Sequence, residues 1–424
     1  MIQQVLQLSG ELSPGATAIA LGRLAVAVLL LAVSPLALYW LGWQYFDTGG
    51  SPIEKFHPAV LVTLGLVLLT ISANGNPLSG LVSLMDRNRE LYPFLAANVF
   101  MMAYASVVLK LPVTNFIETF IGAALIALMF QNLPETEGRR LAWVIHALFF
   151  ANAVLGFYEQ FAGWHLTPLV VNGEELTDEP RSTALFGHPL ANAILMGGYV
   201  VMLALGGGRD LPIALRSVCF LVALASMVPF GGRAATGATL ACLLCLGARR
   251  GWAVFRGESF DRSIVLAVLV IVPLAGLALL TAFELGAFDT LTNRLADDGG
   301  SAGTRIEMFQ LFRYLSLEDL IFGPDQAVLM TWVRLHGLEY GIESFVVAFV
   351  LNYGLLPTGI FFPALAQFFC YVKRLCRPGA GIALLYFLAV ALTSTSLSSK
   401  SPALSMYVMM LLVLLRLDRG SSRH

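Results

Sequence analysis

The sequence is a succession of apolar runs, most of them close to the length of a membrane-spanning helix, with charged residues gathered between them. Of the 424 residues, 57% are hydrophobic and 12% are charged, whereas soluble domains have about 25% charged residues. So few charges do not cover a water-exposed surface of this size. The net charge of −1 also gives no attraction to nucleic acid. These features argue against a soluble enzyme, a disordered chain and a nucleic-acid-binding protein, and they predict a polytopic membrane protein.

A helix needs about 20 mainly apolar residues to cross a bilayer, and about 12 runs approach that length. We therefore expect an all-α fold in which residues 1–424 form a single integral membrane domain. The first run lacks the positive start and the cleavage site of a signal peptide, so we expect it to stay in the membrane. The expected spans are 24–43, 58–74, 94–110, 116–131, 141–162, 190–206, 212–229, 234–248, 263–283, 355–372, 380–396 and 403–416.

The positions of the cations predict how these spans are oriented. With the N-terminus inside, the cytoplasmic loops and termini hold 17 of the 26 lysine and arginine residues, as the positive-inside rule requires. This predicts an even number of spans with both termini in the cytoplasm. Two long loops then face outside, residues 163–189 and residues 284–342, and loops longer than about 12–15 residues are usually functional.

Residues 342–377 allow two arrangements. A hairpin of two spans would put Lys373, Arg374 and Arg377 outside, against the charge bias. We favour a half-inserted helix from Glu343 to Tyr353, broken at Gly354 and Pro357 and followed by one span. Irregular backbone at this depth needs protein or water around it, which predicts a cavity near the outer face.

Within the larger outer loop, Thr304-Arg305-Ile306-Glu307 has the pattern of a capping box and precedes apolar residues at helical spacing. A helix that begins there has Arg305 in its first turn, where free N–H groups and the helix dipole favour an anion. Arg305 then either binds a phosphate or pairs with one of the many carboxylates of the same loop. The other candidate substrate-binding residues of this loop are Arg313, Arg334 and His336.

Arg233 lies among glycines and alanines at the outer end of the eighth expected span. These small neighbours let a ligand or another backbone approach the guanidinium, although an arginine at a membrane boundary can also simply extend to water. Arg181 and His188 flank the segment that leads into the sixth span, and both are candidate ligand contacts. Glu118, Glu159 and Tyr158, near other outer span ends, are expected to make interfacial polar contacts.

Glu343 enters otherwise apolar sequence, E-S-F-V-V-A-F-V-L. A carboxylate in such surroundings has a raised pKa unless cations or donors keep it ionised, and it is then suited to accept a proton from a hydroxyl. Alternatively, it is a helix-start carboxylate stabilised by the dipole. The sequence has no motif for a metal centre or a dinucleotide and no D-x-D pair of metal-dependent glycosyltransferases, so we expect neither a metal nor a cofactor.

Together these elements resemble the O-antigen ligase-like superfamily, which includes O-antigen ligases and the polymerases of O-antigen and exopolysaccharide. The likeness covers mainly residues 140–370. It rests on many spans, an R-S-T-A-L-F-G-H-P-L segment before a helix, Arg233 among small residues, and Arg305 in a long periplasmic loop. Glu343-Ser344 is then followed, after nine residues, by Gly354. Family members have histidine where this chain has Glu343, and their closing Gly-x-x-[Gly/Thr/Tyr] is here Gly354-Leu-Leu-Pro357.

The resemblance implies a multi-pass protein of the bacterial inner membrane with its active site facing the periplasm. The implied substrate is a glycan on undecaprenyl diphosphate, whose anomeric carbon is attacked by an acceptor hydroxyl with inversion. Arg233 and Arg305 would stabilise the leaving diphosphate and Glu343 would be the base. Because ligases of the family carry histidine at that position, the glutamate favours a polymerase that joins lipid-linked repeat units.

Two alternatives remain. One is an O-antigen ligase that transfers the glycan to lipid A core, and the other is a transporter or flippase of polyprenyl-linked sugars. Transporters place ionisable residues near the bilayer midplane on broken, repeated helices, whereas the candidate residues here collect at one face. The expected partners are the lipid bilayer, the lipid-linked donor and acceptor, and chain-length regulator or export proteins.

Overall fold

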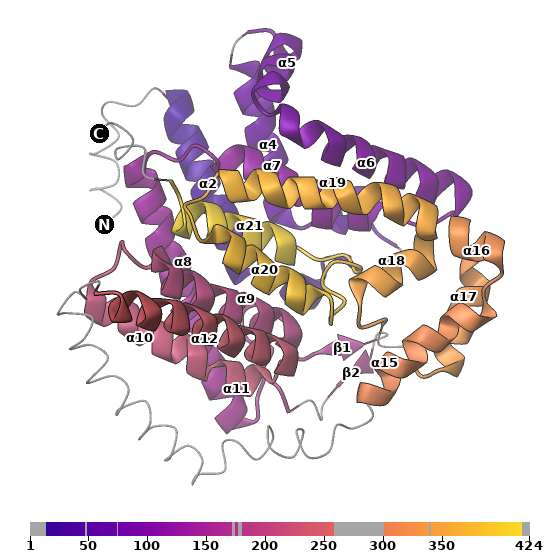
Figure 1. Ribbon diagram of the computed structural model, residues 1–424. Coiled ribbons are helices and arrows are strands. Elements are labelled where there is room, and N and C mark those ends of the chain that lie inside the picture. The colour runs from indigo at the N-terminus through magenta and orange to yellow at the C-terminus, as the bar shows by residue number, and fades with distance from the viewer. Residues whose placement is uncertain are drawn as a thin grey trace.

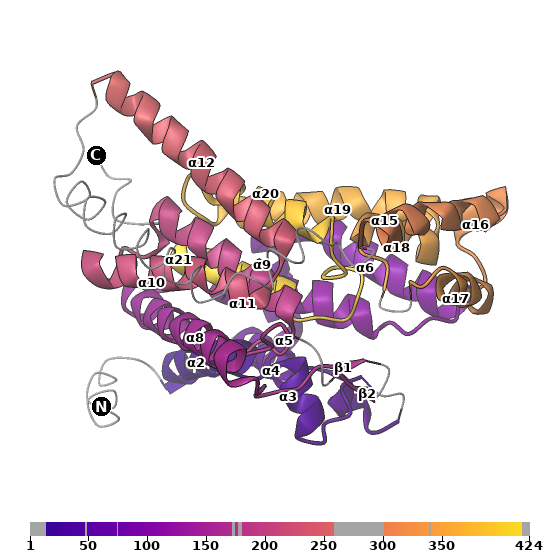
Figure 2. The ribbon, with the colours of Figure 1, turned by 90° about the horizontal axis from the view of Figure 1, so that it is seen from below.

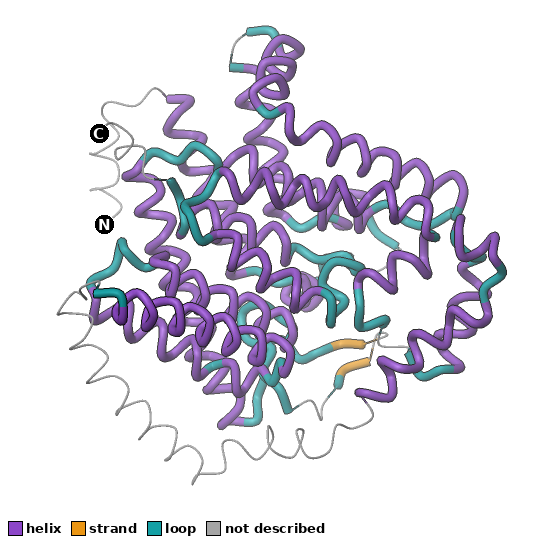
Figure 3. Tube along the Cα trace, in the orientation of Figure 1, coloured by secondary structure: helices purple, strands orange, loops and turns teal. Residues whose placement is uncertain are grey.

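The computed structural model describes residues 14–46, 49–73, 75–171, 174–176, 180–257, 301–338 and 341–417. The regular secondary structure of this part of the chain is helical apart from one antiparallel pair of two-residue strands, and the longer helices lie side by side (Figures 1 and 3). The elements before the strand pair are α2 (Pro14–Ala32), α3 (Pro35–Trp40), η1 (Pro52–Lys55), α4 (Pro58–Ser72), α5 (Pro77–Arg87), η2 (Arg89–Leu91), α6 (Tyr92–Ala103), η3 (Tyr104–Val108), η4 (Phe116–Ile121), α7 (Gly122–Phe130) and α8 (Glu135–Ala162). Those that follow are β1 (Val170–Val171), β2 (Glu174–Glu175), α9 (Pro189–Met202), η5 (Leu203–Gly207), α10 (Ile213–Ala225), α11 (Met227–Phe230), α12 (Arg233–Phe255), α15 (Ser301–Gln310), η6 (Leu311–Tyr314), α16 (Leu317–Phe322), α17 (Gln326–Leu335), α18 (Phe345–Tyr353), α19 (Leu355–Arg374), α20 (Ala380–Ala391) and α21 (Ala403–Leu414).

Seven helical segments of the described chain are long and apolar enough to cross a membrane, which agrees with a multi-pass membrane protein. The pair α4 and α5, bent by 106°, makes an eighth if it counts as one broken span. Three shorter apolar helices, Phe116–Phe130, α20 and α21, complete the bundle. The expected span 263–283 and residues 284–300 of the larger outer loop lie outside the described residues.

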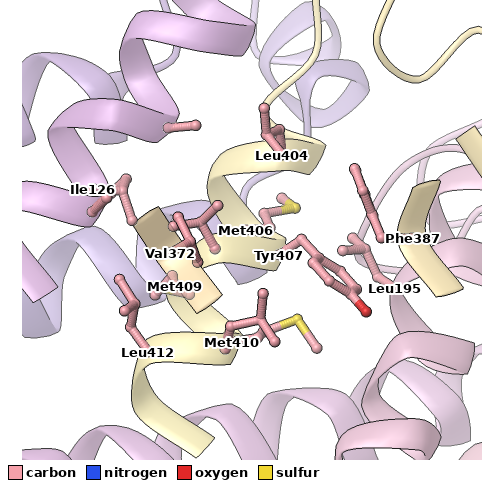
Figure 4. Packing of buried hydrophobic residues seen from close by; sticks show 14 of the residues in the cluster. Ile126, Leu195, Val372, Phe387, Leu404, Met406, Tyr407, Met409, Met410 and Leu412 are labelled. Carbon is pink, nitrogen blue, oxygen red and sulfur yellow. The ribbon is translucent and has the colours of Figure 1, made fainter. Parts of the chain in front are cut away.

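The helix α21 occupies the centre of the bundle. All of its residues are buried, as expected for a helix that is apolar on every side. Figure 4 shows its side chains among Ile126 of α7, Leu195 of α9, Val372 of α19 and Phe387 of α20. At 12 residues it is about 18 Å long, shorter than the hydrocarbon core of about 30 Å. Polar groups can therefore lie at both of its ends without leaving the bundle.

One end of the bundle, which we call the cation end, gathers arginines from distant parts of the chain. Arg416, just after α21, donates to both carboxylate oxygens of Asp210 at 2.7 and 2.8 Å. Arg23 of α2 contacts Glu137 of α8 at 3.0 Å, and the remaining contacts of this end involve Arg139, Arg209 and Arg377. These cations belong to the set that the sequence analysis assigns to one side of the membrane. The opposite end, which we call the loop end, carries β1, β2 and α15–α17 (Figures 1 and 2).

Two expected spans, 24–43 and 380–396, are divided or shortened in the structure. The first, 24–43, is α2, which begins ten residues earlier, and the separate helix α3. Pro35 lacks an N–H to continue α2, and the Ser34 side chain instead caps α3 by accepting from the Ala37 N–H at 3.0 Å. The expected span 380–396 ends at Ala391, because the residues that follow form a polar loop.

We predict that the Asp210–Arg416 pair contributes strongly to stability. Burial raises the pKa of Asp210, but the hydrogen bonds and charge of Arg416 outweigh it and hold the pKa below its ordinary value. The stabilisation is therefore present at neutral pH and is lost as the pH falls through that lowered pKa. Arg416→Met, which leaves the carboxylate without its main partner, should cost about 3 kcal/mol in a detergent unfolding titration.

The matched control is Arg89→Met. Arg89 pairs with Asp86 at 3.2 Å, but their side chains are 73% and 49% exposed. Such exposed pairs contribute at most about 1 kcal/mol. Equal losses from the two variants would contradict the prediction.

Candidate functional site

Residues 342–377 form one short helix, α18, followed by the single long helix α19. This order agrees with the favoured arrangement, and we keep the name half-inserted helix for α18. Glu343 is not the first helical residue, because Ser344 caps α18, and Glu343 lies half-buried in the bend before it. The break is at Gly354 alone, and Pro357 lies in the first turn of α19, where a proline fits a helix. Because α19 ends with Arg374 near the cation end, α18 and Glu343 lie toward the loop end.

Gly354 is required for this break by two independent features. Its φ of 86° is unfavourable for residues with a side chain, and an added Cβ would lie 2.4 Å from the Gly323 nitrogen and 2.5 Å from the Ile321 oxygen. The backbone of α18 therefore meets the end of α16 directly at Gly354. This close approach gives a physical reason for the glycine that follows Glu343-Ser344 at a fixed spacing.

The helices of the larger loop pack on α18 and form a small hydrophobic core of their own. Met308 and Leu311, together with Leu329 and Val333 of α17, cluster with Leu351 and other residues of α18. The loop is thus a packed cover over the half-inserted helix at the loop end (Figures 1 and 2).

The helix that contains Arg305 includes more residues than expected. In the described chain α15 begins at Ser301, so Thr304 is an interior residue and Arg305 lies beyond the first turn. The prediction that Thr304 caps this helix is wrong, because Ser301, Ala302 and Gly303 also adopt helical backbone. The argument from free N–H groups near Arg305 therefore no longer applies, and its side chain lies outside the described residues.

His336 links two helices of the larger loop. Its Nδ1 lies 2.6 Å from Glu307 Oε2 and its Nε2 lies 3.2 Å from the Tyr314 hydroxyl. The Tyr314 ring also stacks on Trp332, with centroids 4.3 Å apart. Both ring nitrogens of His336 therefore have protein partners that join α15 and η6 to the end of α17. The other two candidates of this loop, Arg313 and Arg334, are exposed.

Glu159, near the end of α8, fixes the backbone of the segment between Arg181 and His188 by hydrogen bonds. The Glu159 carboxylate is buried and accepts from the N–H groups of Thr183 at 2.8 Å, Ala184 at 2.9 Å and Leu166 at 2.9 Å. Ala184 has a φ of 41°, a costly conformation for a residue with a Cβ, and the bond from its N–H helps to fix it. Because these N–H groups bind Glu159, the segment has a fixed conformation. We call this segment and the side chains that hold it the support.

Two asparagines complete the support. Asn152 accepts from the Leu185 N–H at 2.9 Å and donates to Asn192 at 2.9 Å, and Asn192 donates to the Thr183 carbonyl at 2.5 Å. His188 is exposed and is the N-cap of α9, where its Nδ1 accepts from the Leu190 N–H at 3.1 Å. His188 is therefore held at the start of α9.

Arg233 is the first residue of α12 and lies close to the same support. Gly232 allows α12 to start directly against α9, because an added Cβ would lie 2.3 Å from the Cβ of Ala193. The Ser182 N–H donates to the Pro229 carbonyl at 3.0 Å, which ties the residue after Arg181 to the turn that leads to Arg233. The backbone at Arg181, His188 and Arg233 therefore lies near the first turns of α9.

Several residues outside the candidate set have stronger structural roles than the sequence suggested. Glu118 and Glu159 are buried, whereas Tyr158 is 59% exposed. Lys400, which was not among the expected site residues, donates to the Tyr45 carbonyl at 2.7 Å. Its position in a polar run between two apolar runs was the available signal. In the described chain no group of three histidine, cysteine, aspartate or glutamate residues is arranged to hold a metal ion.

No model of a known protein family matches the sequence, and no curated protein matches it either.

We predict that Gly354→Ala abolishes the activity of the protein, because the Cβ would push α18 away from the end of α16. Gly359→Ala is the matched control, since it lies on α19 with nothing within 4 Å of an added Cβ. Activity and thermal stability in detergent should both fall for Gly354→Ala and stay unchanged for Gly359→Ala. Wild-type behaviour of Gly354→Ala would show that the contact is dispensable.

Proposed function

We propose that the chain is a polysaccharide polymerase of the O-antigen ligase-like superfamily. It would be a glycosyltransferase with about 12 spans that joins undecaprenyl-diphosphate-linked repeat units at the periplasmic face of the bacterial inner membrane. The observation that supports the proposal is that the backbone at Arg181, His188 and Arg233 lies near the first turns of α9. These backbone positions lie away from the cation end, toward the end that also holds Glu343 under the packed helices of the larger loop.

The arrangement suits displacement of a diphosphate. An acceptor hydroxyl attacks the anomeric carbon, the new carbon–oxygen bond forms, and the bond from that carbon to the diphosphate oxygen breaks. One displacement of this kind inverts the anomeric configuration. The hydroxyl proton passes to Glu343, and the charge that develops on the diphosphate is stabilised by Arg233 and Arg305. Guanidinium groups pair with phosphate oxygens in a fork geometry and need no metal for this role.

The half-inserted helix supports the proposal in a second way. A substrate with a polyprenyl tail and a polar head group must place its reacting bond at the membrane boundary. A helix that enters from outside and turns back at Gly354 puts a carboxylate at that boundary, while the exposed apolar faces of the bundle suit the tail. Irregular backbone of this kind is tolerated where protein surrounds it, as α15–α17 do here.

We predict that Arg233→Ala lowers the rate of glycan transfer by about 10²–10³-fold and that Glu343→Gln lowers it by about 10²–10⁴-fold. The assay uses purified protein in lipid vesicles with the labelled repeat-unit lipid as donor and acceptor. The matched control is Arg250→Ala, an exposed arginine far along the same helix α12, which should retain full activity. Chain growth with these effects supports the polymerase, and retained activity of Arg233→Ala would rule out its role.

The same assay separates the alternatives. Transfer that occurs only when lipid A core is supplied would identify a ligase. Movement of the labelled sugar across sealed vesicles, without a new glycosidic bond, would identify a transporter and overturn the proposal.

A further inference from the structure

The residues between α20 and α21 form a polar segment inside an otherwise apolar part of the sequence. Residues 393–401, T-S-T-S-L-S-S-K-S, which we call the hydroxyl loop, have a hydroxyl or ammonium group at eight of nine positions. The helices on either side have almost no polar side chains. Such a dense set of hydroxyl groups at the end of the central helix is not needed to build an apolar bundle.

The hydroxyl loop has a defined conformation. Leu397 is completely buried beneath it. Two backbone carbonyls of the loop accept hydrogen bonds from η4 and from Asn115, the residue before η4. Asn115 donates to the Ser398 carbonyl at 3.2 Å, and Thr119 donates to the Ser399 carbonyl at 3.2 Å. The loop is therefore preorganised, which lowers the entropy cost of binding a ligand.

The ammonium group of Lys400 ties the loop to Tyr45 by a hydrogen bond and a cation–π contact. Its Nζ donates to the Tyr45 carbonyl at 2.7 Å and lies 3.6 Å from the centre of the Tyr45 ring. Burial lowers the pKa of Lys400 to about 8, although the nearby Glu118 carboxylate opposes this shift. Glu118 is itself fixed by the His57 N–H at 3.1 Å. The only cation of the loop is therefore directed toward the protein interior. Several hydroxyl groups also bond within the protein: those of Thr393, Ser398 and Ser399 donate to backbone carbonyls, and those of Ser394 and Ser396 lie 2.9 Å apart. The Thr395 hydroxyl has no hydrogen bond to the described residues and is the group of the loop that can meet a ligand.

The loop lies beside the half-inserted helix. Gly341 has a φ of 106°, and a Cβ added to it would lie 3.1 Å from Cγ2 of Thr395. Gly341 is two residues before Glu343, so Thr395 lies next to the segment that carries the candidate base. Ser399 is exposed, and Thr395 and Ser396 are half-buried. A hydroxyl group such as that of Thr395, which can both donate and accept, is suited to another hydroxyl group.

We propose that the hydroxyl loop, through Thr395, binds the sugar hydroxyls of the lipid-linked substrate beside Glu343, with the Lys400–Tyr45 contact as its support. This inference rests on the proposed function, because it assigns part of the same substrate. It assigns the glycan rather than the diphosphate to the loop, since the Lys400 ammonium is directed toward Tyr45.

Photo-crosslinking tests the contact itself. A photoreactive amino acid at position 395 is combined with the labelled repeat-unit lipid isolated from cells that lack the protein. The matched control carries the same group at position 385, because Leu385 of α20 is 67% exposed on an apolar helix. We expect a glycan-lipid adduct at position 395, about tenfold weaker with sugar-free undecaprenyl diphosphate, and only phospholipid adducts at position 385. Adducts of phospholipid alone at position 395 would overturn the inference.

Kinetics separate this inference from the proposed function. Thr395→Val should raise KM for the repeat-unit lipid about tenfold with little change in kcat, as expected when uniform binding is lost. Thr331→Val, at an exposed position of α17, should change neither constant. If the wild type forms glycosidic bonds but Thr395→Val has normal constants and position 395 gives no adduct, the inference fails alone. If position 395 gives the glycan adduct but no bond is formed, the proposed function fails and the binding surface stands.

Discussion

The burial of α21 is the constraint on which the rest of the structure depends. A short helix that is enclosed on all sides cannot reach both membrane surfaces by itself, so each of its ends must satisfy polar groups within the bundle. At one end Arg416 follows the last turn, where a cation is favoured by the helix dipole, and it pairs with Asp210. Before the other end, Lys400 donates to the Tyr45 carbonyl and lies over the Tyr45 ring. These two interactions tie α21 to segments more than two hundred residues earlier in the chain.

The two ends of the bundle consequently differ in chemistry. The cation end is joined by arginine contacts between helices, as expected of a surface that remains on one side of a membrane. The loop end is built from glutamate, asparagine and serine groups that fix irregular backbone, namely the segment after Arg181, the turn before Arg233 and the half-inserted helix. A rigid support of this kind is what a site needs if charged side chains are to be held near a reacting bond.

Local pattern predicted the helices well where the apolar runs were long. The span 58–74 and the half-inserted helix that ends at Gly354 agree with α4 and α18 within a few residues. The errors arose where tertiary contacts decide the outcome. A proline and a capping serine divide the first span, and hydrogen bonds from Asn115 and Thr119 stabilise polar backbone where the pattern favoured a continued helix. Similarly, a capping pattern at Thr304 cannot reveal that the preceding residues also become helical.

For the candidate site, sequence alone identified the side chains but not their supports. Arg233 and Glu343 stand out as charges in apolar surroundings, whereas Glu159 becomes important only when the N–H groups of a distant loop are placed over it. His336 was a candidate ligand contact, and its bonds to Glu307 and Tyr314 could not be read from the sequence. Partners far apart in the chain cannot be paired from spacing, and this limited the prediction.

The proposed site is tested most directly by a structure with undecaprenyl diphosphate bound. We expect the diphosphate to lie at the loop end in contact with the guanidinium of Arg233, with Glu343 on the side where an acceptor would enter. A diphosphate bound at the cation end, or an Arg233 side chain turned away from it into the lipid, would rule out this site.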